Sequence, residues 1–254
     1  MNSRYLKNLL PLIKLFVLVL FIMICSSHSS EKQDSPEIRV LVITGGHAFE
    51  HEAFFEMFDS LSGITYTEVT QPDANQLYSS PMMNKYDALV FYDMVQEITD
   101  EQKEAFINLL EEGKGMIFLH HSLASYQEWN EFRRIIGGRY YLQPYFNGSK
   151  QYTASTYKHG VEIPVKIPDK NHPVTAGLKE FIIHDEVYGN FEVLPEVHPI
   201  LSTTHPESGE IIGWTNSYKN SKIVYIQLGH DHHAYSNPKY RRLLKQAISW
   251  VLNK

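Results

Sequence analysis

The stretch IRVLVITGGH, residues 38–47, decides the fold of this 254-residue chain. The apolar and β-branched run Ile38–Ile43 is uninterrupted, which is typical of a strand buried on both faces of a sheet. Gly45 and Gly46 end that strand in a tight turn. An amphipathic helix is predicted next, over residues 53–61. Strand, glycine turn and helix in this order begin a βαβ unit.

The same alternation continues along the chain. Further strands are predicted at Ile64–Val69, Tyr86–Tyr92, Gly115–His120 and Lys222–Leu228, and helices after the capping-box pair Thr99 and Gln102, over Glu128–Ile136, and after Asn237. Strands that alternate with helices imply parallel strands with right-handed crossovers. Between residues 140 and 218, short alternating runs broken by Pro and Gly predict β-rich insertions on the same sheet. The expected fold is therefore α/β, with a doubly wound, mostly parallel sheet.

Residues 1–30 are expected to be a leader and not part of the fold. An uncharged apolar run over Leu15–Cys25 is preceded by Arg4, Lys7 and Lys14 and followed by several serines. This order is typical of a secretory signal, and the run is shorter than the ~20 residues of a membrane-spanning helix. Cys25 suggests a lipoprotein acceptor, with free release after cleavage or an uncleaved anchor as alternatives.

This leader predicts an exported protein, either periplasmic or anchored on the outer side of the inner membrane. A polar linker is expected at residues 31–37 and one domain at residues 38–254. A membrane would then be contacted only through the leader or a lipid anchor.

Composition excludes several functions. Cys25 is the only cysteine, so a body without its leader has neither a disulfide nor a thiol nucleophile. The formal net charge is −6 and becomes more acidic without the leader's cations. The sequence has no stretch rich in Lys and Arg, which argues against a nucleic-acid partner.

Polar residues collect where the predicted strands end. His47 follows the first strand, Asp93 the third, His120 and His121 the fourth, and His230 the last. In open parallel sheets, ligands bind beyond the carboxyl ends of the strands. These side chains are therefore expected to share one pocket, although each histidine taken singly is more often structural.

Two further polar segments allow two interpretations each. The segment GHDHH, residues 229–233, has the composition of a metal site, with Asp231 orienting an imidazole, or is a solvated loop. Asp185 and Glu186 are either a general base or metal ligand, or exposed charges at the end of a strand. Tyr188 and Tyr235 are candidates for contact with the ligand.

In sequence order, these residues resemble the ThuA-like (trehalose-utilisation) family of the class I glutamine amidotransferase-like superfamily. The matching segments are ITGGHAFEH (43–51), YDALVFYD (86–93), GKGMIFLHHS (113–122), IIGGRY (135–140), HPVTAGL (172–178), DEVY (185–188) and IVYIQLGHDHHAY (223–235). They cover nearly all of the chain after the leader. The resemblance implies a flavodoxin-like sheet and a link to the catabolism of disaccharides or oxidised sugars.

The resemblance also bears on the chemistry. It places His47, His120, Asp185, Glu186, Tyr188 and His230 at motif positions. In the superfamily, the turn after the fourth strand carries a cysteine nucleophile, where this chain has His120-His121-Ser122. Glutamine amidotransferase chemistry is therefore not expected. Many relatives carry a histidine soon after the IGG segment, where this chain has Leu142-Gln143-Pro144.

The leading hypothesis is an exported enzyme that acts on a small sugar, such as a disaccharide or keto-sugar derivative. Its catalytic residues would be His47, His120, Glu186 and His230, and its substrate contacts Asp93, His121, Asp185, Tyr188 and Tyr235. No cofactor is required by the pattern, but His47, His120 and His230 are candidate ligands for a divalent metal such as zinc. The alternatives are a sugar-binding accessory protein without catalysis and a metal-dependent hydrolase of an unrelated substrate.

Overall fold

The computed structural model describes residues 37–252 except residue 148, and they belong to one compact unit, Glu37–Lys254. The predicted leader and most of the predicted linker lie outside the described residues. No helix in the described part of the chain has the length and apolarity that crossing a membrane requires. All the segments that carry the family resemblance, and all the predicted strands, lie within this unit.

The unit combines a large sheet with helices and two small ribbons. In chain order its elements are β1 (Ile38–Gly45), α2 (His51–Asp59), β2 (Ile64–Thr70), α3 (Asp73–Leu77), the 3-10 helix η1 (Pro81–Lys85), β3 (Ala88–Asp93), α4 (Asp100–Glu111), β4 (Gly115–Leu119), the 3-10 helix η2 (His120–Ala124), α5 (Asn130–Ile136), β5 (Gly138–Arg139), β6 (Tyr145–Asn147), β7 (Lys150–Tyr152), β8 (Thr156–Lys166), β9 (Phe181–Gly189), β10 (Glu192–Val193), β11 (His198–Thr203), β12 (Ile211–Tyr218), β13 (Ser221–Ile226), α6 (His232–Tyr235) and α7 (Pro238–Leu252).

The main sheet has nine strands in the order β2-β1-β3-β4-β13-β12-β11-β8-β9. From β2 to β13 neighbouring strands are parallel, and from β13 to β9 they are antiparallel. The parallel part is the flavodoxin-like sheet expected from the alternation. The antiparallel part is built from the predicted β-rich insertions, which join the same sheet as expected.

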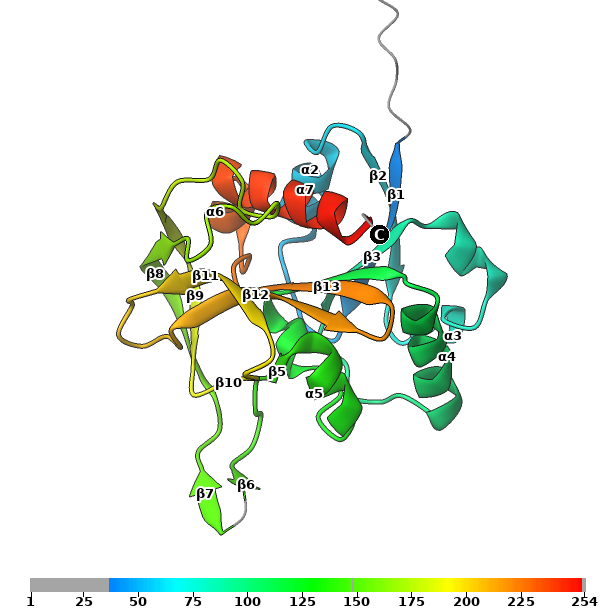
Figure 1. Cartoon of the computed structure of the whole chain (residues 1–254), viewed down its shortest axis with the longest axis horizontal. Helices are drawn as coiled ribbons and strands as arrows, with labels where there is room; N and C mark the ends of the chain where they lie inside the picture. Colours follow the sequence, from blue (N-terminus) through cyan, green and yellow to red (C-terminus); the bar gives the residue numbers. More distant parts are fainter. Residues whose placement is uncertain (1–36, 148, 253–254) are drawn as a thin grey trace, which may run out of the picture. The chain divides into compact units, whose positions relative to one another are not determined.

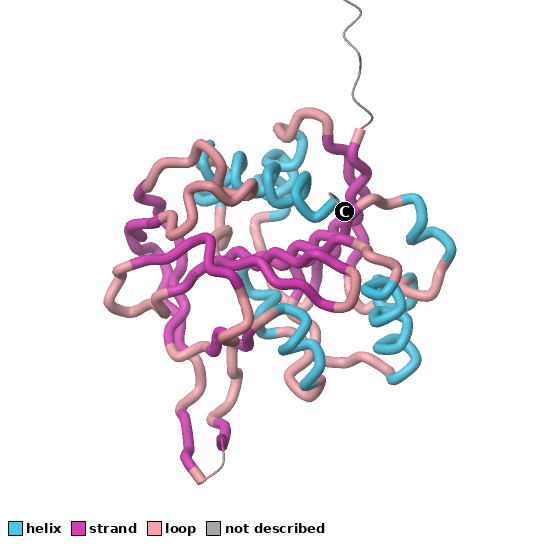
Figure 2. Tube along the Cα trace, in the orientation of Figure 1, coloured by secondary structure: helices cyan, strands magenta, loops and turns pink. Residues whose placement is uncertain are grey.

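Helices cover both faces of the sheet, as Figures 1 and 2 show. On one face, α2 and α7 bury Phe54, Phe58, Leu243 and Ile248 against the strands. On the other, α4 and α5 contribute residues such as Phe106. Because the strands are covered on both sides, they need the continuous apolar runs from which they were predicted.

Helix starts agree with their sequence signals. Thr99 and Gln102 form the complete capping box of α4: the Thr99 side chain accepts from the Gln102 backbone N–H, and the Gln102 side chain accepts from the Thr99 backbone N–H. The Asn237 side chain accepts from the backbone N–H groups of Lys239 and Tyr240 at the start of α7. Each cap satisfies N–H groups that the first turn leaves without partners.

Some elements depart from their sequence patterns. The acidic pair Asp185 and Glu186 lies inside β9, so the alternative of exposed charges at a strand end is wrong. His232 and His233 belong to the short helix α6 and not to an irregular loop. The hairpin of β6 and β7 extends from the body of the unit (Figure 1). Helix α3 was not predicted, because five residues are too few to show a periodic apolar stripe.

Candidate functional site

His120 lies at the first position after β4, where a parallel strand ends and the chain must turn. Its φ is +50°, in the left-handed region that residues with a Cβ rarely adopt. The Nδ1 atom lies 2.7 Å from the carbonyl oxygen of Gln227. A carbonyl only accepts, so Nδ1 carries a hydrogen and Nε2 is the atom that faces the site. Such strain at a buried polar residue is typical of functional positions.

The Nε2 atom of His120 is the centre of a polar cluster. It lies 2.9 Å from the Tyr188 hydroxyl, 3.1 Å from His230 Nδ1 and 3.3 Å from Glu186 Oε1. Glu186 and Tyr188 come from β9, and His230 follows β13. The cluster therefore joins the parallel part of the sheet to the antiparallel strand at its edge.

Charge pairing shifts the pKa values in this cluster. Burial lowers the pKa of His120, but its hydrogen bond and charge interaction with Glu186 raise it above its ordinary value. Burial raises the pKa of Glu186, but the same contact with His120 leaves it below its ordinary value. Both shifts favour an imidazolium beside a carboxylate. The pKa of His230 is lowered, by burial and by the positive charge of His120.

His159 is a member of this cluster that sequence reasoning missed. Its Nδ1 contacts Glu186 Oε2, and its ring lies 4.5 Å from that of His230 between centroids. It belongs to β8, at a bulge where the pairing with β9 shifts and Gly160 adopts φ +65°. The KHG sequence at residues 158–160 carried no motif. Its one signal was a glycine inside an alternating run, which marks a bulge.

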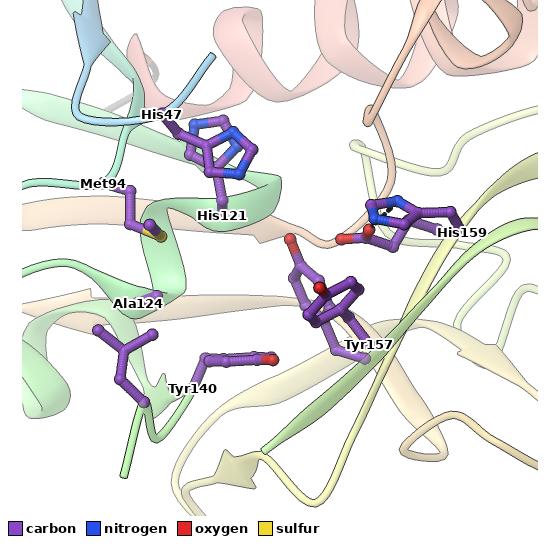
Figure 3. Close-up of a pocket in the computed structure, with 10 residues that line it drawn as sticks. His47, Met94, His121, Ala124, Tyr140, Tyr157 and His159 are labelled. Carbon is purple, nitrogen blue, oxygen red and sulfur yellow. Dashed lines mark ion pairs between the residues drawn. The ribbon is translucent and has the colours of Figure 1, made fainter. Parts of the chain in front are cut away.

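His47 and His121 lie on another side of the same cavity, as Figure 3 shows. Their rings stack with centroids 4.7 Å apart. His121 is buried, and neither of its ring nitrogens has a hydrogen-bond partner. Burial lowers the pKa of His121 well below its ordinary value, and the nearby His120 and His47 lower it further. A neutral His121 offers one donor and one acceptor to a ligand.

The cavity itself has a volume of about 260 Å³. Its lining residues are His47, Met94, His121, Ala124, Tyr140, Leu142, Tyr157, His159, Glu186 and Tyr188. Five imidazoles form a continuous row, in the order His47, His121, His120, His230 and His159, with centroid separations of 4.7, 5.5, 5.2 and 4.5 Å. His47, His121 and His159 line the cavity, whereas His120 and His230, predicted to be catalytic, are not among its lining residues. The wall thus mixes aromatic faces with proton-transferring groups, a combination suited to a polar ring-shaped ligand.

Three residues predicted to contact the substrate do not line this cavity. Asp185 is buried, and its carboxylate accepts the backbone N–H groups of Gly229 and His230 at 2.7 and 2.9 Å. Tyr235 is buried, and its hydroxyl donates to the carbonyl oxygen of His230. Asp93 is buried and accepts from the Gln71 side chain at 2.9 Å. The polar atoms of Asp185 and Tyr235 are hydrogen-bonded inside the protein. The prediction that these two residues contact the substrate directly is therefore wrong, and they position the segment that carries His230 instead.

Asp93 makes a second contact through its backbone. Its backbone oxygen accepts the hydroxyl of Ser125, in the turn that follows η2. Burial raises the pKa of its carboxyl group to about 7. The correction for Asp93 is the same: its side chain faces Gln71 and not the ligand cavity.

The residues grouped as candidate metal ligands also differ from the prediction. In the described part of the chain, His120, Glu186 and His230 bring one ligand atom each within 4.8 Å of the others. His47 does not belong to this group. Its ring stacks on His121 instead, since the Gly45-Gly46 turn directs it to that side of the cavity. Two imidazoles and a carboxylate are a ligand set that suits zinc.

A flavodoxin-like sheet with a histidine and glutamate pocket at its carboxyl edge defines the class as class I glutamine amidotransferase-like, with histidine at the turn after β4. A family model described as ThuA, trehalose utilisation, matches residues 39–251, and the chain belongs to this family. No match is found among curated proteins.

Solved structures show the same fold. A ThuA-like protein from Parabacteroides merdae is 18% identical, with a TM-score of 0.71 over 85% of this chain and 90% of that one. A ThuA-like protein from Bacteroides uniformis is 20% identical, with a TM-score of 0.66 over 89% and 95%. A cytoplasmic protein from Salmonella typhimurium is 12% identical, with a TM-score of 0.58 over 84% and 99%. At these identities the likeness concerns the fold alone.

Proposed function

We propose that this protein is an exported enzyme of carbohydrate catabolism that acts on a small sugar, a disaccharide or keto-sugar derivative, in the cavity beside His120. The observation that carries this proposal is the buried contact between His120 Nε2 and Glu186 Oε1, 3.3 Å apart, in which Glu186 lines the cavity and His120 lies behind it. Membership of the trehalose-utilisation family supports the substrate class. A volume of about 260 Å³ suits one sugar ring, with the rest of a larger ligand in solvent.

The chemistry follows from the protonation states. Glu186, ionised and close to three imidazoles, is the base that removes a proton, and His120, whose pKa is raised, is the acid that supplies one to a departing oxygen. A keto group acidifies the adjacent C–H bond, so elimination or hydration proceeds there without a strong nucleophile. His121 and Tyr188 bind hydroxyl or carbonyl oxygens by hydrogen bonds. No cysteine is needed for any of these steps.

The test is turnover by the full chain of a panel of disaccharides, trehalose among them, and of their keto derivatives, followed by mass spectrometry of the products. His120→Gln and Glu186→Gln should each lower kcat/KM by at least about 100-fold, the contribution expected of a general acid or base. His198→Gln is the matched control, since His198 is exposed and paired with Asp169 away from the cavity. Equal activity in all four proteins would contradict the proposal. Binding by calorimetry without any product would favour a sugar-binding accessory protein.

A metal-dependent hydrolase of another substrate is the second candidate, because His120, Glu186 and His230 offer three ligand atoms within 4.8 Å. In that case a divalent metal such as zinc would bind there and polarise the substrate. Elemental analysis of purified protein tests this role. A stoichiometric metal that is lost in His230→Ala favours it, and a protein active without metal argues against it.

Export is proposed from the leader sequence at residues 1–30. Cell fractionation with an epitope at the carboxyl end tests it. Protein in the periplasm or outer face of the membrane, shortened at its amino end, is the expected result. Full-length protein confined to the cytoplasm would contradict export while leaving the assignment of the pocket intact.

A further inference from the structure

A second histidine cluster lies outside the cavity, on the surface where α6 meets β9. It consists of His184 in β9 and His232 and His233 in α6. The ring centroids of His232 and His233 are 3.9 Å apart, and those of His184 and His233 are 4.7 Å apart. All three side chains are exposed by 39–55%. None of them lines the cavity beside His120.

Each of these imidazoles has its own carboxylate on the same ring atom. The Nδ1 contacts are His184 with Glu162 at 2.9 Å, His232 with Glu50 at 2.8 Å, and His233 with Asp231 at 3.2 Å. An ionised carboxylate can only accept, so Nδ1 holds the hydrogen in all three rings. In the neutral form the lone pair of each ring is therefore on Nε2, the atom that can bind a metal.

We propose that His184, His232 and His233 form a surface site for a divalent transition metal ion of the zinc, nickel or copper class. A carboxylate on Nδ1 of a metal-binding imidazole fixes the tautomer and increases the basicity of Nε2. Imidazole ligands suit these ions, whereas magnesium and calcium require oxygen ligands. Two of the three ligands, His232 and His233, already place one ligand atom each within 4.8 Å of the other and of an Asp231 oxygen. His184 lies beside them through its ring contact with His233. The side chains are exposed, so small rotations can complete the site.

The position of this site links it to the segments that carry the cavity residues. His184 precedes Glu186 by two residues in β9, and His232 follows His230 by two residues. An ion held by His184 and His233 would connect β9 directly to α6. Bound metal should therefore raise the unfolding temperature of the protein. The inference does not depend on the reaction that takes place in the cavity.

The test is calorimetric titration of the full chain with Zn²⁺ alone, in a His120→Gln background that disables the other candidate metal group. We expect one equivalent to bind. Substituting His232→Gln and His233→Gln together should abolish that binding, and Glu50→Gln, which removes only the carboxylate from His232, should weaken it by about 10–100-fold. Mg²⁺ should neither bind nor raise the unfolding temperature.

His198→Gln is again the matched control. His198 contacts Asp169 through Nε2, the atom that would have to bind a metal, and the Nδ1 atom of the neighbouring His172 already accepts a backbone N–H. This substitution should leave zinc binding unchanged. If circular dichroism shows that His120→Gln does not fold, Glu186→Gln serves instead, because it also removes one ligand of the group formed by His120, Glu186 and His230. Absence of zinc binding in the background variant, or binding that survives loss of His232 and His233, would overturn the proposal. Either result would leave the function proposed for the cavity standing.

Discussion

Neighbouring charges determine how equally buried polar residues titrate around the cavity. His120 and His121 are neighbours in sequence, yet the pKa of one is raised and that of the other is lowered. The difference arises because His120 faces Glu186, whereas His121 has no carboxylate to offset burial and lies beside other imidazoles. One turn of chain thus holds an imidazole whose protonated form is favoured next to one whose neutral form is favoured.

His159 should act on Glu186 by holding its pKa down, together with His120 and His230. Replacing His159 by Gln removes one of the interactions that lower it, so the pKa of Glu186 should rise. Because the carboxylate form is the proposed base, activity in the variant should be lost at a higher pH on the acid side. The pH–rate profile of kcat/KM measures this shift. A lower rate with an unmoved acid limb would show that His159 has only a packing role.

Asp93 should make stability depend on pH. Its pKa is about 7 in the folded protein against an ordinary value of 3.8, because its carboxyl group is buried. With the folded value raised, its contribution to stability is complete below the unfolded pKa and is lost as pH rises toward 7. A tenfold difference in proton affinity between the folded and unfolded states corresponds to about 1.4 kcal/mol of stability.

Asp93→Asn cannot ionise and keeps an oxygen that accepts from Gln71. The free energy of unfolding of the variant minus that of the unsubstituted protein should therefore increase by a few kcal/mol between pH 4 and pH 8. Urea unfolding at the two pH values measures this difference. The prediction fails if the gap between the two proteins is independent of pH.

At the scale of elements, the cavity depends on how β9 holds the segment after β13. Asp185 accepts N–H groups from Gly229 and His230, and thereby connects the edge strand to the turn that carries His230. The register between β8 and β9 also shifts at the bulge, which brings His159 to the cavity. Neither connection joins neighbours in sequence.

Replacing Asp185 by Ala should detach this turn from β9. Hydrogen bonds to charged groups contribute about 1.5–3 kcal/mol each, so the free energy of unfolding should fall by at least about 2 kcal/mol. Asp185→Asn retains one acceptor and should lose less. Thermal unfolding of the two variants gives the comparison, and equal stability of Ala and Asn would contradict the role of the carboxylate.

The capping box of α4 is a local contribution that can be measured separately. Thr99→Ala removes the acceptor for the Gln102 backbone N–H and should cost about 1 kcal/mol. Thr99→Ser keeps a hydroxyl and serves as the control. Because α4 lies on the face of the sheet away from α7 and contributes no residue to the cavity lining, turnover should not change in either variant.

At the scale of the whole molecule, one nine-stranded sheet runs through the parallel and antiparallel parts. The residues of both faces pack against the same strands, so neither part has a core of its own. The cavity lies where residues from the two parts meet. A ligand that bridges them should therefore stabilise the whole unit.

A chain of residues 37–254 should fold without residues 1–36 and unfold in one transition. The sheet begins at Ile38, and the compact unit begins at Glu37. Calorimetry should give equal calorimetric and van't Hoff enthalpies, the mark of two-state unfolding. Two separate transitions would show that the antiparallel part is an independent domain.

Much of the fold could be predicted because its signals are local. The strand Ile38–Gly45, the capping box at Thr99 and the start of α7 at Asn237 are each encoded within a few residues. The site was harder, since strand ends identify His120 and His230 but not their partners. His159 lies in an antiparallel insertion, and its approach to Glu186 depends on a bulge whose one sequence signal is Gly160.

The amino-acid sequence by itself determined the order of strands and helices, the parallel sheet, the absence of a cysteine at the turn after β4 and the family to which the chain belongs. Only the tertiary structure decided which imidazoles meet Glu186, that His47 stacks on His121, and that Asp185 and Tyr235 serve the backbone. The physical reason is the distance along the chain over which each interaction acts. Periodicity and capping depend on neighbours in the chain, whereas proton affinity and ligand contact depend on burial and on charges that the fold brings together from distant segments.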